Sequence, residues 1–155
     1  MAVFLLSACT TAGPAADSSA HASPSAPDRC TSVVKYDPLP DWARGGFSPN
    51  APPMAHVLSD RGEIMAILFA EPLTTPPRPD RNNKILWKTL TPVTQGGFKI
   101  EAQRVGTGET TSIEDVDPPG PSIIDLPQPG CWRLSLTWPG KTDTIDLVYV
   151  QGNAS

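Results

Sequence analysis

The stretch that decides the fold is Pro127-Gln128-Pro129-Gly130-Cys131-Trp132-Arg133-Leu134-Ser135-Leu136-Thr137-Trp138-Pro139-Gly140. Large apolar side chains alternate with smaller or polar ones, which is the period of a β-strand with one face in a core. The apolar face consists of Trp132, Leu134, Leu136 and Trp138. We therefore expect Cys131 to face outward. The Pro139-Gly140 pair predicts a turn into a last apolar strand over residues 142–150.

The rest of the chain is a series of short apolar runs separated by prolines. Proline accounts for 19 of 155 residues, more than twice the usual share of about 5%, and it interrupts long helices. Further strands are predicted at residues 31–36, 55–58, 63–69, 83–91, 97–105 and 122–126. The intervening segments 37–53, 72–80 and 106–121 are predicted to be loops.

This pattern predicts an all-β domain over residues 30–151. We expect an antiparallel immunoglobulin-like β-sandwich of about seven or eight short strands with long proline-rich loops. A small closed barrel is the alternative. The run 64–69 is apolar without alternation, which indicates a central strand covered on both faces. Trp42 and Phe47, in the loop 37–53, are expected to cover one end of the core.

Charge and hydropathy narrow the class of protein. The net charge is −4 and the pI is about 5.0, which argues against a nucleic-acid partner because such proteins present a basic face to phosphates. The apolar run near the start, residues 2–6, is far too short to span a bilayer. Any attachment to a membrane therefore requires something other than this segment as a membrane-spanning helix.

The segment Leu6-Ser7-Ala8-Cys9 is similar to the lipobox of bacterial lipoproteins. The resemblance implies that residues 1–8 are the remnant of a signal peptide and that Cys9 carries a diacylglyceryl lipid and begins the mature chain. No Lys or Arg precedes Cys9, so we expect the true start to lie upstream. An ordinary apolar N-terminus with a chance cysteine is the alternative.

Residues 10–29 consist almost entirely of small and polar residues without apolar periodicity. Such a segment cannot bury enough surface to fold, so we expect residues 9–29 to form a lipidated, disordered tether. A flexible chain of this length reaches about 25 Å. Residues 152–155 are expected to be a short tail.

The chain has three cysteines, Cys9, Cys30 and Cys131. With Cys9 lipidated, an even pair remains, and disulfides persist in exported proteins. We expect a Cys30–Cys131 disulfide, which would close a loop of about 100 residues and contribute up to about 4.7 kcal/mol in the chain-entropy model. Two separate buried or redox-active thiols are the alternative.

Two further segments, Asn83-Lys84-Ile85-Leu86-Trp87 and Pro129-Gly130-Cys131-Trp132, together with the lipobox, resemble a group of small bacterial cell-surface lipoproteins with a proline-rich immunoglobulin-like β domain. The resemblance covers most of the chain from Cys30 onward. It implies an envelope location and a sandwich-like fold, and it carries no catalytic residues with it.

His56 is the one histidine in the predicted domain. A Ser-His-Asp hydrolase would need it beside Asp60 and a serine such as Ser59 or Ser122. The Gly-x-Ser-x-Gly turn that presents a nucleophilic serine in many hydrolases is absent from the sequence. A structural histidine at the start of a strand is the preferred interpretation.

Met54, His56 and Met65 are weak candidates for a copper site, because thioether and imidazole ligands suit Cu(I). Methionine more often fills gaps in a core. We therefore expect no metal and no other cofactor.

Arg78, Arg81 and Lys84 form a candidate anion-binding loop for a lipid headgroup, a sugar acid or a wall phosphate. Asp80 dilutes this charge, so a solvated loop is the preferred interpretation. The acidic residues of the segment 106–121 do not have the spacing of a calcium loop. They are Glu109, Glu114, Asp115 and Asp117.

These observations predict a lipid-anchored protein on the extracytoplasmic face of the cell membrane. We expect a binding or structural module rather than an enzyme, with an envelope protein or a wall polymer as partner, acting through exposed loops or a sheet edge. A small envelope enzyme or metal carrier that uses His56 is the alternative.

Overall fold

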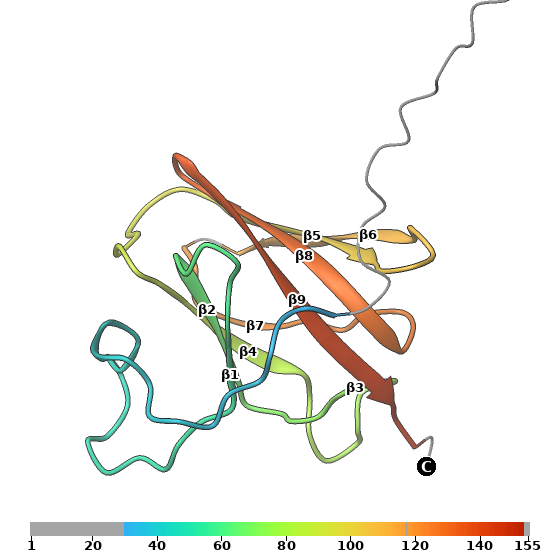
Figure 1. Ribbon diagram of the computed structural model, residues 1–155, viewed down its shortest axis with the longest axis horizontal. Coiled ribbons are helices and arrows are strands. Elements are labelled where there is room, and N and C mark those ends of the chain that lie inside the picture. The colour runs from blue at the N-terminus through green and yellow to red at the C-terminus, as the bar shows by residue number, and fades with distance from the viewer. Residues whose placement is uncertain (1–29, 117, 154–155) are drawn as a thin grey trace, which may run out of the picture.

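The protein is a sandwich of two β-sheets, as the computed structural model in Figure 1 shows for residues 30–116 and 118–153. The predicted β-sandwich is confirmed. No helix within these ranges is long and apolar enough to cross a membrane. The elements of the described part are η1 (Asp41–Ala43), β1 (His56–Leu58), β2 (Ile64–Leu68), β3 (Leu73–Thr75), β4 (Lys84–Thr89), β5 (Phe98–Arg104), β6 (Thr110–Val116), β7 (Pro121–Ile123), β8 (Gly130–Trp138) and β9 (Lys141–Gln151).

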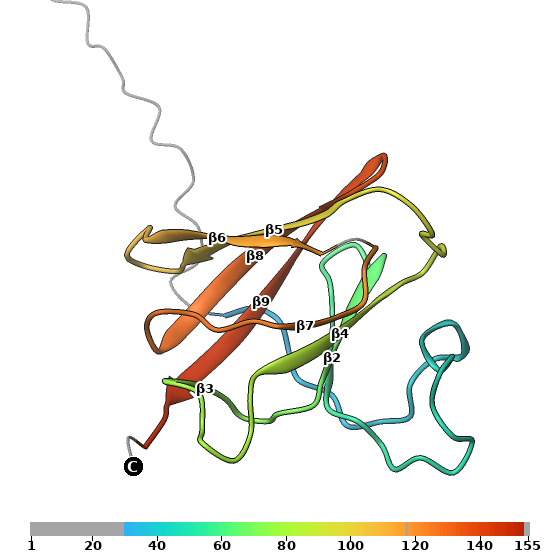
Figure 2. The same cartoon turned by 180° about the vertical axis from the view of Figure 1, so that it is seen from behind.

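The first sheet has the strand order β1-β2-β4-β7 and the second has the order β3-β9-β8-β5-β6. The two sheets lie one behind the other in the opposite views of Figures 1 and 2. All neighbouring strands are antiparallel except β3 and β9, where Leu73 pairs with Tyr149 in a parallel ladder. The expected antiparallel sandwich therefore has one parallel pair, at this edge, because the chain crosses to the second sheet after β2 and adds β3 there.

The central stretch of the sequence forms β8, which pairs with β5 on one side and β9 on the other. Its four large apolar side chains are buried, as predicted, and the residues between them are more exposed. An aromatic pair connects the two sheets, since Phe98 of β5 lies 5.5 Å from Trp87 of β4, measured between ring centroids. Within the second sheet, Phe98 also lies 6.5 Å from Trp138 of β8. The core therefore includes both inner faces.

Strand β2 is buried at every position, which confirms the prediction of a strand covered on both faces. One face contributes to the main core, and the other places Met65 and Ile67 in a second cluster with Leu39 and Ala43. Trp42 and Phe47 were expected over one end of the core, but they pack against this second cluster. The loop that contains η1 thus covers the outer face of the first sheet.

Three predicted elements are wrong. Residues 31–36 form no strand apart from a single bridge between Lys35 and His56, because the chain here passes from one sheet to the other. The segments 72–80 and 106–121 were predicted as loops, yet they contain β3 and β6. Both are edge strands. Prolines or turns flank each of them, and β3 has only three residues, so the sequence pattern does not reveal these pairings.

Buried polar side chains tie the two sheets together. Asn83, before β4, accepts a hydrogen bond from the backbone N–H of Thr74 in β3 (3.0 Å) and donates one to its carbonyl (2.8 Å). Asp143 of β9 accepts hydrogen bonds from the Ser59 hydroxyl (2.6 Å) and from the N–H of Arg61 (3.1 Å) in the β1–β2 turn. The Asn83 carboxamide thus provides hydrogen-bond partners for backbone groups of the β3 edge, and the Asp143 carboxylate does so for the β1–β2 turn.

Candidate functional site

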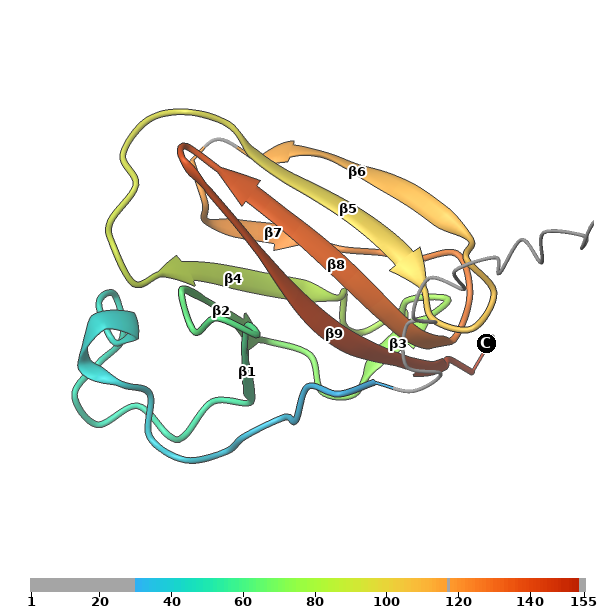
Figure 3. The ribbon, with the colours of Figure 1, turned by 45° about the horizontal axis from the view of Figure 1, so that its top comes forward.

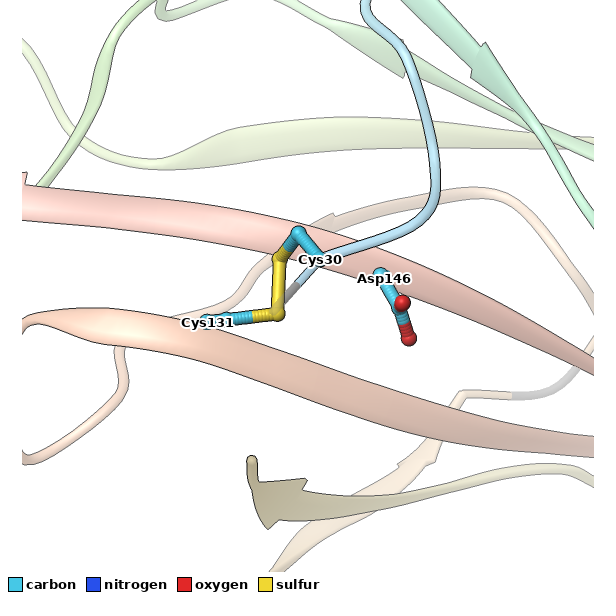
Figure 4. A group of neighbouring side chains, drawn as sticks. All are labelled: Cys30, Cys131 and Asp146. Atoms are coloured by element: carbon cyan, nitrogen blue, oxygen red, sulfur yellow. A yellow bond between two sulfur atoms is a disulfide. The ribbon is translucent and has the colours of Figure 1, made fainter. Parts of the chain in front are cut away.

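The described chain begins at a clamp on the outer side of the second sheet. Cys30 forms a disulfide with Cys131 at the start of β8, with the two Cα atoms 5.4 Å apart, a normal separation for a disulfide. Figure 4 shows the bond next to Asp146 of β9. The predicted pairing is confirmed, and it lies outside the sandwich interior because Trp132, not Cys131, faces the core.

Asp146 is the centre of this clamp. Its side chain is on the outward side of β9, yet the residue is only 3% exposed. Its carboxylate accepts hydrogen bonds from the N–H (2.9 Å) and the hydroxyl (2.8 Å) of Thr31, and its own N–H donates to the hydroxyl of Ser32 (2.9 Å). We call Cys30, Thr31 and Ser32 the chain root.

Arg133 of β8 completes the clamp from the opposite side. Its guanidinium donates from Nε (2.8 Å) and Nη2 (3.0 Å) to the two carboxylate oxygens of Asp146, and the two residues are cross-strand partners. Such a bidentate pair is strong and fixes its geometry. Arg133 is part-exposed, so the pair retains contact with solvent on one side.

The ion pair determines the charge state of the site. Burial by itself would raise the pKa of Asp146, but the hydrogen bonds from Arg133 and Thr31 together hold that pKa below its usual value. The same hydrogen bond from Arg133 to Asp146 raises the pKa of Arg133, although burial opposes this. The clamp is therefore a charged, internally neutralised pair.

The clamp brings together atoms that could bind a metal, but these atoms already have other bonding partners. Potential ligand atoms of Cys30, Cys131 and Asp146 lie within 4.8 Å of one another. Both sulfurs are bonded to each other, and the carboxylate already accepts hydrogen bonds from Thr31 and Arg133. The arrangement holds the chain root against strands β8 and β9.

His56 does not meet the partners that a hydrolytic triad requires. Its Nδ1 donates to the carbonyl of Met54 (2.8 Å), and its Nε2 lies 3.5 Å from Asp37. Ser59 instead donates to Asp143. The other two candidates have separate partners, since Asp60 accepts from Thr144 and Ser122 accepts from the Trp87 ring.

Packing places the two soft-metal methionines at the same cluster, without His56. Met65 is buried in the second cluster, and Met54 packs against the edge of that cluster. His56 is buried as well, but it is not part of this cluster. Its ring nitrogens face the Met54 carbonyl and Asp37 rather than a thioether.

The candidate anion-binding residues each have a contact within the described part of the chain. Arg78 forms an ion pair with Asp80 at 3.1 Å, and Lys84 lies over the ring of Phe69, 5.1 Å from its centroid. Arg81 pairs with Arg78 only through the backbone. Arg78 and Asp80 border a shallow hollow of about 430 Å³ beside the end of β9.

The acidic candidates are placed only in part. Glu109 lies 3.8 Å from Arg104, which joins the two ends of the β5–β6 turn. The side chains of Glu114 and Asp115, and the whole of Asp117, lie outside the described residues. The lipid-attachment candidate Cys9 and the tether 9–29 also lie outside them.

One surface feature was not predicted from the sequence. The η1 loop forms a groove of about 250 Å³ with an apolar lining that is rich in proline. Figure 3 shows this loop at the far end of the domain from the chain root. The residues that line the groove are Pro38, Leu39, Arg44, Phe47, Ser48, Pro49, Ala51, Pro52, Pro53 and Met54.

Comparison with known proteins provides no further assignment. No protein-family model, curated protein or solved structure matches this chain.

Proposed function

We propose that this protein is a lipid-anchored binding or interaction module on the extracytoplasmic face of a bacterial cell envelope. The observation that carries the proposal is the clamp at the chain root, where a disulfide and a buried ion pair fix residues 30–32 to the sheet. A domain held by its N-terminal segment needs a firm attachment where that segment meets the fold.

The disulfide supports an extracytoplasmic location. Disulfides persist in oxidising compartments and are rare in a reducing cytosol. Cys30 and Cys131 are separated by 101 positions in the sequence, so their bond closes most of the domain into one covalent loop. The remaining cysteine, Cys9, lies in the lipobox-like segment, where a lipid would provide the anchor.

The proposed binding surface is the η1 loop. This loop, which lines the groove, lies at the opposite end of the domain from the chain root in Figure 3, so an anchor at the root would leave the groove accessible. The loop rests on the second hydrophobic cluster through Leu39 and Ala43, which gives an otherwise irregular segment a fixed base. Exposed loops on a rigid sandwich are common binding surfaces.

The anchor is tested with the chain expressed in a bacterium from a start that includes a complete signal peptide. We expect intact mass spectrometry to find lipid on Cys9 and fractionation to recover the protein with membranes. Cys9→Ser should release it into the soluble extracytoplasmic fraction, while Cys30→Ser should leave lipidation intact. An unlipidated, soluble wild-type product would contradict the anchor.

The binding role is tested separately by photo-crosslinking in intact cells. A crosslinking amino acid at Ser48, in the groove, should capture a defined partner, and one at Thr137, on the outer face of β8, should not. Both positions are exposed, so the second serves as a matched control. Equal capture at both sites, or at neither, would contradict the groove as the binding surface.

A further inference from the structure

The chain root is held in place by contacts that do not involve sulfur. Thr31 directly follows Cys30, and its N–H and hydroxyl both donate to Oδ2 of Asp146 at 2.9 and 2.8 Å. The next residue, Ser32, accepts a hydrogen bond from the N–H of Asp146 at 2.9 Å. Three hydrogen bonds therefore connect the two residues after Cys30 to one residue of β9.

The position of Cys131 relative to Asp146 is also set without the disulfide. Cys131 is opposite Val148 in the β8–β9 ladder, and Arg133 is opposite Asp146. The Arg133–Asp146 pair adds two side-chain hydrogen bonds between the same strands. The ladder and the ion pair together place the Asp146 carboxylate within 4.8 Å of the sulfur position.

We propose that Asp146 is the positioning residue for the Cys30–Cys131 disulfide: it captures Thr31 and so presents Cys30 to Cys131 before the two sulfurs are joined. The next backbone attachment of this segment is the Lys35–His56 bridge, at 2.8 and 3.0 Å. Five extended residues span about 17 Å, so a root held only at Lys35 would let Cys30 occupy a large volume. The Asp146 contacts confine it beside its partner.

The ion pair also suits the chemistry of oxidation. A thiolate is the attacking species in thiol–disulfide exchange, and a lone carboxylate within a few ångströms would oppose its charge. Arg133 neutralises Asp146 through two hydrogen bonds. The carboxylate can therefore hold Thr31 without repelling the neighbouring sulfur.

The reaction needs an external oxidant, for which we take a small-molecule disulfide such as oxidised glutathione. One cysteine thiolate attacks it, forming a mixed disulfide and releasing one glutathione thiolate. The second cysteine thiolate attacks the protein sulfur of the mixed disulfide, forming the Cys30–Cys131 bond and releasing the second glutathione. Two cysteine thiols are oxidised, one glutathione disulfide is reduced, and the two thiol protons pass to the released glutathione.

The test measures the equilibrium between reduced and oxidised protein in glutathione buffers, using the full chain with Cys9→Ser so that two thiols remain. Reduced and oxidised forms are separated by alkylation and mass spectrometry. We expect Asp146→Asn to lower the equilibrium constant by about tenfold or more, since hydrogen bonds to charged groups contribute about 1.5–3 kcal/mol. Thr31→Val, which keeps the N–H donor, should lower it by about threefold.

The matched control is Asp143→Asn. Asp143 lies on the same strand and is also 3% exposed, but it holds the β1–β2 turn instead of the chain root. This variant should leave the constant within about twofold of the parent, provided that circular dichroism shows a folded reduced protein. The comparison separates positioning of Cys30 from a general loss of stability.

Three results would overturn the proposal. The first is an Asp146→Asn constant within twofold of the parent, and the second is an equal fall in Asp143→Asn. If reduced Asp146→Asn does not fold, Thr31→Val and Ser32→Ala decide, because these changes are at the chain root itself. Parent-like constants in both of these variants would also overturn the proposal, whereas a fall in either supports it.

Discussion

The phenolic oxygen of Tyr149 lies 2.7 Å from the carbonyl oxygen of Ile124, and its O–H donates a hydrogen bond there. Tyr149 belongs to β9 in the second sheet, whereas Ile124 follows β7 in the first. Both residues are almost fully buried. This hydrogen bond therefore joins the two sheets through the core, where a polar group without a partner would be costly.

Tyr149→Phe should lower the free energy of unfolding by about 1–2 kcal/mol, because it removes the hydrogen bond and leaves the Ile124 carbonyl without this donor. Urea denaturation monitored by tryptophan fluorescence measures the change. Tyr36→Phe is the control, because Tyr36 is 57% exposed, and it should change stability by less than about 0.5 kcal/mol. Equal effects in the two variants would show that the inter-sheet bond contributes nothing specific.

Stability should also fall in alkaline solution through the same residue. Burial, together with the nearby charge of Asp125, raises the pKa of Tyr149 well above its usual value of about 10. A raised pKa in the folded state means that this contribution is complete below pH 10 and is lost as the pH rises beyond it. Between pH 8 and 11, the free energy of unfolding should therefore fall more steeply with pH in the wild type than in Tyr149→Phe. Denaturation curves recorded at several pH values measure this difference.

The clamp should weaken in acid. The pKa of Asp146 is lowered in the folded state, so its contribution is present above the unfolded value of about 4 and is lost as the pH falls below it. The difference in unfolding free energy between the wild type and Asp146→Asn should accordingly be constant from pH 5 to 7 and shrink below pH 4. A difference that does not change down to pH 2 would contradict the charged ion pair.

Asn83→Ala should destabilise the β3 edge. The Asn83 carboxamide pairs with both backbone groups of Thr74 and donates to Asp125 at 2.8 Å. Its loss leaves buried backbone groups unpaired, at about 1–3 kcal/mol each. Hydrogen exchange should show faster exchange at Thr74 in this variant, while Asn82→Ala, at the exposed neighbouring position, should leave that rate unchanged.

The sequence was sufficient for the parts of the fold that depend on hydrophobic pattern. The alternation from Trp132 to Trp138 identified a half-buried strand, and the unbroken apolar run at β2 identified a strand covered on both sides. The cysteine count, taken with the lipobox-like segment, identified the disulfide. Each of these signals is either a local sequence pattern or a count of cysteines, so it does not require knowledge of the three-dimensional arrangement.

The remaining features depend on long-range contacts. Thr31 and Asp146 are separated by 115 positions, and no local pattern relates them. A signal was nevertheless present: Asp146 lies between the apolar residues Ile145 and Leu147 of the last strand, and a buried carboxylate requires partners. Strand β3 is only three residues long, and its parallel pairing depends on where β9 lies, which the sequence of β3 does not indicate.

The disulfide also determines how tension would travel through the molecule. A pull on the chain ahead of Cys30 passes through the sulfur bridge into β8, which has hydrogen-bonded neighbours on both sides, β9 and β5. Residues 31–130 lie within the loop that the disulfide closes, so this force does not pull them from the fold one contact at a time. The load therefore enters the fold at the start of β8, at the position that pairs with Val148 near the end of β9, and not at the contacts of the chain root.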